Sequence, residues 1–94
     1  MDAGMLFDEL YEIGARRIGN GDYPSSLPIK LVHRVGGGEG QGEYAERVYE
    51  HDNDGEMIYF KITGFYSSYD GTDWDSDIQR VTPQEKTITV YVKY

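Results

Sequence analysis

The stretch that decides the fold runs from Glu43 to Tyr66 and reads EYAERVYEHDNDGEMIYFKITGFY. On both sides of Asp54-Gly55, the residues alternate in character with a period of two, which is the period of a β-strand. Asp-Gly between two such runs is typical of a tight β-hairpin, because both residues tolerate positive φ. The stretch therefore predicts strands over 43–50 and 57–66, joined by a turn over 51–56.

Three further runs with strand character flank this hairpin. They cover residues 29–35, 78–82 and 86–94, with a glycine-rich loop over 36–42 and a polar loop over 67–77 between the segments. Together they predict an antiparallel sheet of four to five strands within residues 28–94. The face that we expect to be buried carries Ile58, Phe60, Ile62, Ile88 and Val90, and His33 is expected on a core face. The face that we expect to meet water carries Tyr49, Tyr59 and Tyr91.

The N-terminal part has the periodicity of a helix instead. Apolar residues recur at helical spacing through residues 4–18, with acidic residues early and arginines late, which matches the helix dipole. Gly19-Asn20-Gly21 then ends the helix, because these residues tolerate positive φ. One helix that covers one face of an antiparallel sheet is an α+β fold. We expect the helix to pack on the sheet through Phe7, Leu10 and Ile13.

The length, the lack of Cys and the net charge of the chain exclude several classes of protein. The chain has 94 residues, no Cys and a formal net charge of −8. This length predicts a single domain over residues 1–94, and the lack of Cys excludes disulfides and thiol nucleophiles. The negative charge disfavours direct binding to nucleic acid, because phosphate contacts need a basic face. The acidic N-terminus and the lack of a long apolar run predict a cytoplasmic protein that does not bind a membrane.

No stretch has the spacing of a catalytic or metal-binding signature. The glycine-rich loop lacks the lysine of a phosphate-binding loop and is followed by a predicted strand. Acidic residues cluster over 50–55 and 70–77, but neither cluster supplies a complete set of calcium ligands. The two histidines, His33 and His51, lie on a predicted strand and in a predicted turn. We therefore predict that the protein is not an enzyme and uses no metal and no cofactor.

The loop after the hairpin is the part of the sequence that is richest in residues that bind protein partners. It places three large aromatic residues among small and acidic ones. Tyr and Trp provide broad contact area, and carboxylates steer association with a basic partner. The predicted partner-binding residues are Tyr66, Tyr69, Asp70, Asp73, Trp74, Asp75 and Asp77. The alternative, above all for Trp74, is that the rings fold back over the end of a small core.

Three blocks of sequence, in this order, resemble a family of small uncharacterised proteins encoded by tailed bacteriophages. The blocks are the glycine- and glutamate-rich stretch at 37–43, the Tyr66-Ser-Ser-Tyr-Asp-Gly71 block, and the ending IQRVTPQEKTITVY at 78–91. None of them is a catalytic signature. The resemblance implies a phage origin, and hence the cytoplasm of a host cell, but no mechanism.

Three functions are compatible with these features. The first is an acidic accessory protein that binds a host or phage protein with a basic surface and modulates or inhibits it. Partial DNA mimicry is its narrowest form. Full mimicry is disfavoured, because duplex DNA as long as such a domain carries about 20 charges, whereas this chain has a net charge of −8. The second is a small-ligand module, for instance for a nucleotide, which requires that basic residues gather in one pocket; the candidates are Arg34, Arg47, Arg80 and Lys86. The third is a minor phage structural or assembly protein. A homodimer is a further candidate assembly, because a DNA mimic would need either a dimer or only a local acidic patch.

Overall fold

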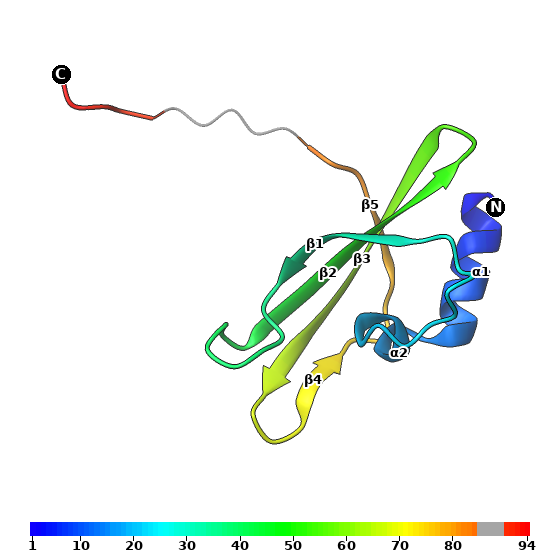
Figure 1. Ribbon diagram of the computed structural model, residues 1–94, viewed down its shortest axis with the longest axis horizontal. Coiled ribbons are helices and arrows are strands. Elements are labelled where there is room, and N and C mark those ends of the chain that lie inside the picture. Colours follow the sequence, from blue (N-terminus) through cyan, green and yellow to red (C-terminus); the bar gives the residue numbers. More distant parts are fainter. Residues whose placement is uncertain (85–89) are drawn as a thin grey trace.

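The computed structural model describes residues 1–84 and 90–94 of the chain. Within these residues, two short helices precede a five-stranded antiparallel sheet (Figure 1). The predicted α+β fold, with a helix at the N-terminus, is confirmed. The helices are α1 (Ala3–Ile13) and α2 (Ala15–Gly19). The strands are β1 (Lys30–Val35), β2 (Tyr44–Asn53), β3 (Glu56–Ser67), β4 (Gly71–Trp74) and β5 (Gln79–Val81).

β3 is the central strand of the sheet. β2 pairs along one side of it, and β4 and β5 pair with two successive parts of its other side. Between these two, the amide of Asp75 donates to the carbonyl oxygen of Thr63 at 2.9 Å and continues the ladder. β1 pairs with β2 and forms one edge of the sheet. The predicted strand over 78–82 is confirmed as β5, whereas the predicted loop over 67–77 is wrong at β4, which pairs with β3.

The hairpin of β2 and β3 forms as the sequence predicts. Asn53 pairs with Glu56, so Asp54 and Gly55 make a two-residue turn with φ angles of 51° and 94°. Positive φ at both positions gives the turn a twist that matches the twist of the strands. The register of the two longest strands is therefore fixed by a local signal.

His51 shows that the predicted turn over 51–56 is too long. This residue belongs to β2, and its imidazole is buried. The two ring nitrogens lie 2.8 Å from the carbonyl oxygens of Pro28 and Met1. A buried polar ring needs such partners, and here they hold the N-terminus and the segment before β1 against the sheet.

The predicted single helix over 4–18 is wrong, because the chain changes direction at Gly14. This residue has φ 99° and ψ 140°, a combination that glycine adopts far more readily than other residues. α1 begins after Asp2, whose carboxylate accepts a hydrogen bond from the amide of Met5 at 2.9 Å. It ends where the amide of Gly14 donates to the carbonyl of Leu10. α2 then follows in a new direction and contacts β4.

Both helices pack on the same face of the sheet, which we call the inner face. Leu6, Leu10 and Ile18 are fully buried in the core that this face shares with the helices. Phe7 is half-buried and meets Phe60 edge-on, with ring centroids 6.2 Å apart. The sheet residues in this core are Ala45, Tyr49, Ile58, Phe60, Ile62 and Trp74. The predicted packing of Phe7, Leu10 and Ile13 on Ile58, Phe60 and Ile62 is thus confirmed.

Two residues lie on the opposite face from the predicted one. Tyr49 is buried on the inner face, where its ring stacks on Phe60 at 5.1 Å and its hydroxyl donates to the carbonyl of Ile18 at 2.8 Å. His33 is exposed instead of packed in the core. The reason is a shift of the β1–β2 register between Leu31 and His33, which breaks the alternation that the sequence suggests.

The C-terminal segment also differs from the prediction. The predicted strand over 86–94 and the predicted core residue Ile88 fall partly on residues 85–89, which lie outside the described residues. Val90–Tyr94 pair with no strand in the described part of the chain, and Val90 and Tyr91 are exposed rather than part of the sheet. Pro83 follows β5 closely and has no amide hydrogen, so it cannot continue the ladder.

Candidate functional site: an arginine pocket

A pocket of about 320 Å³ opens where the inner face of the sheet meets the end of α2. Its lining consists of Gly19, Asn20, Gly21, Tyr23, Leu31, Arg34, Gly37, Arg47, Tyr49, Thr72 and Trp74. Two of these residues are arginines and none is acidic, although the chain contains 17 Asp and Glu residues. We refer to it as the arginine pocket.

Arg47 is the buried charge of this pocket, with only 7% of the residue exposed. Its Nη1 donates to the carbonyl oxygens of Val35 at 2.9 Å and Glu46 at 2.8 Å. Its Nη2 donates to the carbonyl oxygen of Gly36 at 3.2 Å. The guanidinium carbon lies 5.0 Å from the centroid of the Trp74 ring, which is the range of a cation–π contact. Backbone and ring thus hold the group in one orientation.

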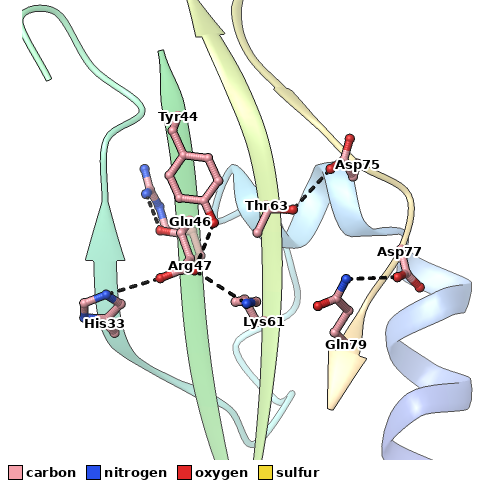
Figure 2. A network of polar contacts seen from close by, with 9 residues as sticks. All are labelled: His33, Tyr44, Glu46, Arg47, Lys61, Thr63, Asp75, Asp77 and Gln79. Atoms are coloured by element: carbon pink, nitrogen blue, oxygen red, sulfur yellow. Dashed lines mark hydrogen bonds and ion pairs between the residues drawn. The ribbon is translucent and has the colours of Figure 1, made fainter. Parts of the chain in front are cut away.

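No carboxylate forms an ion pair with Arg47 within the described residues. Glu46 is adjacent in sequence, but its side chain lies on the other face of the sheet, where it pairs with His33 at 3.3 Å and Lys61 at 3.8 Å (Figure 2). Burial, and then the nearby charge of Arg34, lower the pKa of Arg47. A buried charge without a counter-charge is costly, so an anion in the pocket would stabilise it.

Arg34 supplies a second positive charge beside the first. It pairs with Arg47 in the register of β1 and β2, and both residues line the pocket. Like charges directly opposite each other in an antiparallel pair are destabilising. Unlike Arg47, Arg34 is exposed, so its guanidinium can reorient toward a ligand at the pocket mouth.

Aromatic side chains form the walls of the pocket. The indole Nε1 of Trp74 donates to Oδ1 of Asn20 at 2.9 Å, which fixes the plane of the ring. Gly19 permits this packing, because a Cβ at that position would collide with the indole. Tyr23 meets Tyr49 edge-on at 6.2 Å. Burial, with a smaller contribution from Tyr23, raises the pKa of Tyr49 to about 12, so its hydroxyl is neutral near pH 7.

The structure places the residues predicted to bind a partner in different environments, some exposed and some packed within the protein. Tyr69 and Asp70 are exposed in the turn between β3 and β4, and Asp73 is exposed on β4. Trp74 is buried in the wall of the arginine pocket, which is the alternative that the sequence left open for this ring.

The other three predicted residues make hydrogen bonds within the protein. The hydroxyl of Tyr66 donates to Oε1 of Glu39 at 3.1 Å, which connects β3 to the glycine-rich loop. The hydroxyl of Thr63 donates to Asp75 at 3.1 Å (Figure 2). Asp77 accepts hydrogen bonds from Tyr11 and Gln79, each at 3.3 Å.

The four basic residues proposed to gather in one pocket do so in part. Arg34 and Arg47 come together. Arg80 lies elsewhere and pairs with Glu56 at 3.6 Å, and Lys86 lies outside the described residues. The alternation of β2 could have indicated an inward Arg47, because Ala45 and Tyr49 flank it on the same side.

A comparison of the chain with family models, curated proteins and solved structures finds no match. In the part of the chain that the structure describes, no group of three or more His, Cys, Asp or Glu side chains could hold a metal ion. The same part contains no helix that is both long enough and apolar enough to cross a membrane.

Proposed function

We propose that the protein is a binding module for a small anionic ligand and that the ligand occupies the arginine pocket. The observation that carries this proposal is the buried guanidinium of Arg47, which has no carboxylate partner among the described residues and lies in a pocket without acidic residues. In a chain of net charge −8, such a region would attract an anion through short-range contacts.

The chemistry of the pocket indicates the class of anion. Guanidinium groups bind phosphate and carboxylate through paired, charge-assisted hydrogen bonds. The ring of Tyr23, which is only partly buried, suits a planar group beside the charge. The volume of about 320 Å³ lies near the lower end of the usual range for ligand sites. We therefore expect a phosphate or carboxylate on a small planar group, of which a nucleoside monophosphate is one example.

Calorimetric titration tests the proposal with three probes: inorganic phosphate, a nucleoside 5′-monophosphate and benzoate. We expect at least one to bind, and Arg34→Gln to weaken binding about tenfold or more, because a hydrogen bond to a charged group contributes about 1.5–3 kcal/mol. Arg34 is the preferred position, since it is exposed and its side chain forms no ion pair among the described residues that the fold would lose.

Arg16→Gln is the matched control. Arg16 is also an exposed arginine, but it lies on α2 outside the lining of the pocket. Its replacement removes the same charge and should leave the affinity almost unchanged. Two results would overturn the proposal: no binding of any probe with a Kd below about 1 mM, a very weak affinity, or an equal loss of affinity in both variants.

A separate observation favours a second function at the turn between β3 and β4. Tyr69 is 95% exposed there, next to the exposed carboxylates of Asp70 and Asp73. An aromatic anchor beside acidic residues suits a protein partner with a basic surface. We propose this turn as a partner-binding surface, which would fit an accessory protein that modulates or inhibits a host protein, partial DNA mimicry included.

Kinetics of binding to such a partner separate the two roles in the turn. Tyr69→Ala should mainly speed dissociation, because it removes buried contact area. Asp70→Asn with Asp73→Asn should mainly slow association at low salt, and the effect should fade at high salt. If the triple variant Tyr69→Ala, Asp70→Asn, Asp73→Asn binds the partner as the wild type does, the turn is not the binding surface.

A further inference from the structure

The segment Val90–Tyr94 presents apolar side chains to water. Val90, Tyr91, Val92 and Tyr94 are each at least 72% exposed. Their order, VYVKY, has the alternation and the β-branched and aromatic composition of a strand. Exposed apolar groups of this extent usually mark a contact surface.

The shape of the molecule shows that this segment is not packed on its own domain. The C-terminus lies far from the sheet and the helices (Figure 1). The radius of gyration is 15.6 Å and the longest extent is 54 Å, whereas a compact chain of this length has a radius of gyration of about 12 Å. The apolar side chains of Val90–Tyr94 therefore lack a cover in the part of the chain that the structure describes.

A surface that could cover them lies on the outer face of the sheet, which the helices leave open. A groove of about 430 Å³ crosses this face. Val32, Val48, Tyr59 and Val81 line it, together with Thr82, Pro83 and the ion-paired side chains of His33, Glu46 and Lys61. The groove reaches β1, whose six residues are all exposed. An edge strand with an open side is a template for a further strand.

The register of the sheet argues against occupation of this edge by the segment of the same copy. Val81 pairs with Tyr59, Tyr59 with Glu50 and Glu50 with Lys30, so these four residues form one row across the sheet. The chain therefore leaves β5 at the end of the sheet where β1 begins. To pair antiparallel with the open side of β1, the segment would first have to cross about 19 Å of sheet, which is four strand spacings from β5. It would then have to run along about 17 Å of strand before it could turn back. A second copy has no such constraint.

We propose that Val90–Tyr94 of one copy adds as an antiparallel strand to the edge of β1 in a second copy. Val90, Val92 and Tyr94 then lie over the valines and Tyr59 of the groove. The exchange is reciprocal, so each copy gives one segment and receives one, and the product is a closed homodimer. The proposal does not depend on a ligand in the arginine pocket.

The mass of the full chain in solution is the first test, measured by size exclusion with light scattering. We expect twice the chain mass of 10.7 kDa. Val90→Lys with Val92→Lys, the segment variant, and Val32→Lys, the edge variant, should each give a monomer with an unchanged circular dichroism spectrum, because all three positions are exposed. Met5→Lys, at an exposed apolar residue of α1, should remain a dimer.

Mixing the two monomeric variants tests the exchange itself. The segment variant keeps an intact edge, and the edge variant keeps an intact segment, so one of the two contacts can re-form between them. With a donor fluorophore on one variant and an acceptor on the other, we expect energy transfer in the mixture. In the control, donor-labelled and acceptor-labelled samples of the same variant are mixed, and we expect no energy transfer. A monomeric wild type, dimers that persist in both variants, or a mixture without energy transfer would each overturn the proposal.

Discussion

Arg47 is held by carbonyl oxygens rather than by carboxylates, and this determines what can replace it. Its guanidinium reaches three carbonyl groups, on β2 and at the end of β1. A planar fork with several fixed donors can do this, whereas a lysine ammonium on a flexible stem cannot match the same geometry. Arg47 therefore also anchors the start of the glycine-rich loop, through Val35 and Gly36.

Arg47→Lys should lower the free energy of unfolding by about 1–3 kcal/mol, because carbonyl groups lose their donors while the buried charge remains. Urea denaturation measures this change. Arg16→Lys, at an exposed position, should stay within about 0.5 kcal/mol of the wild type. An equally small effect of Arg47→Lys would show that the carbonyl contacts do not hold the loop.

Tyr49 should make the fold sensitive to alkaline pH. Its pKa in the folded protein is about 12, above the ordinary value of 10, because burial disfavours the phenolate. The neutral hydroxyl therefore contributes stability that is fully present below pH 10 and is lost as the pH rises through 12. Tyr49→Phe should show a smaller decline in the free energy of unfolding between pH 10 and 12. Tyr59→Phe, on the outer face, serves as the control, and identical declines in both variants would contradict the expectation.

At the scale of elements, α1 depends on the sheet for its stability. It has 11 residues, and isolated helices of this length are marginal in water. Leu10→Ala should cost about 2–5 kcal/mol, because the side chain is fully buried and its removal leaves a cavity. Thermal and urea denaturation measure the loss. Met5→Ala on the exposed side of the same helix should change stability little, and a similarly small loss at Leu10 would show that α1 does not dock there.

The elements differ in how far the sequence could predict them. The β2–β3 hairpin was predictable because Asp54-Gly55 is a local signal with a defined turn geometry. The break at Gly14 was not, because one glycine in an otherwise periodic helix gives no direction for the next segment. Tyr49 was placed outward because its hydroxyl is polar, but that hydroxyl finds a carbonyl partner inside.

From the sequence, the arginine pocket could be predicted only as a requirement of one candidate function, the binding of a small ligand. The sequence named Arg34 and Arg47 among the residues that would have to meet, without showing that they do. Their meeting depends on the β1–β2 register, which shifts between Leu31 and His33. A shift of one residue reverses the face of every later side chain, so Arg34 faces inward and His33 outward. No periodicity within a single strand contains that information.

At the scale of the whole molecule, the negative charge of the chain and the positive pocket oppose each other. The overall field of a −8 protein repels an anion at long range, while the two arginines attract it at short range. An anion bound in the arginine pocket should stabilise the folded state, because the buried charge of Arg47 and its repulsion with Arg34 exist only in the folded protein.

Inorganic phosphate should therefore raise the melting temperature of the wild type at constant ionic strength. At a concentration about 100 times the Kd, ligand binding adds about 2.7 kcal/mol to the free energy of unfolding. Differential scanning calorimetry in phosphate and in chloride measures the shift. The shift should be smaller for Arg34→Gln than for Arg16→Gln, and equal shifts in these two variants would indicate a general salt effect.

The central place of β3 also sets the order in which the protein can assemble as it is synthesised. α1 and α2 leave the ribosome before β3, because Phe60 and Ile62, on which they pack, lie some forty residues further along the chain. Until then the apolar side of α1 has no partner. The hairpin needs only its own two-residue turn to close, and local contacts of this kind form quickly. Although α1 is made before the sheet, it can pack only after β3 has formed. A nascent chain stalled before β3 would therefore expose Leu6, Leu10 and Ile18 to whatever binds apolar helices.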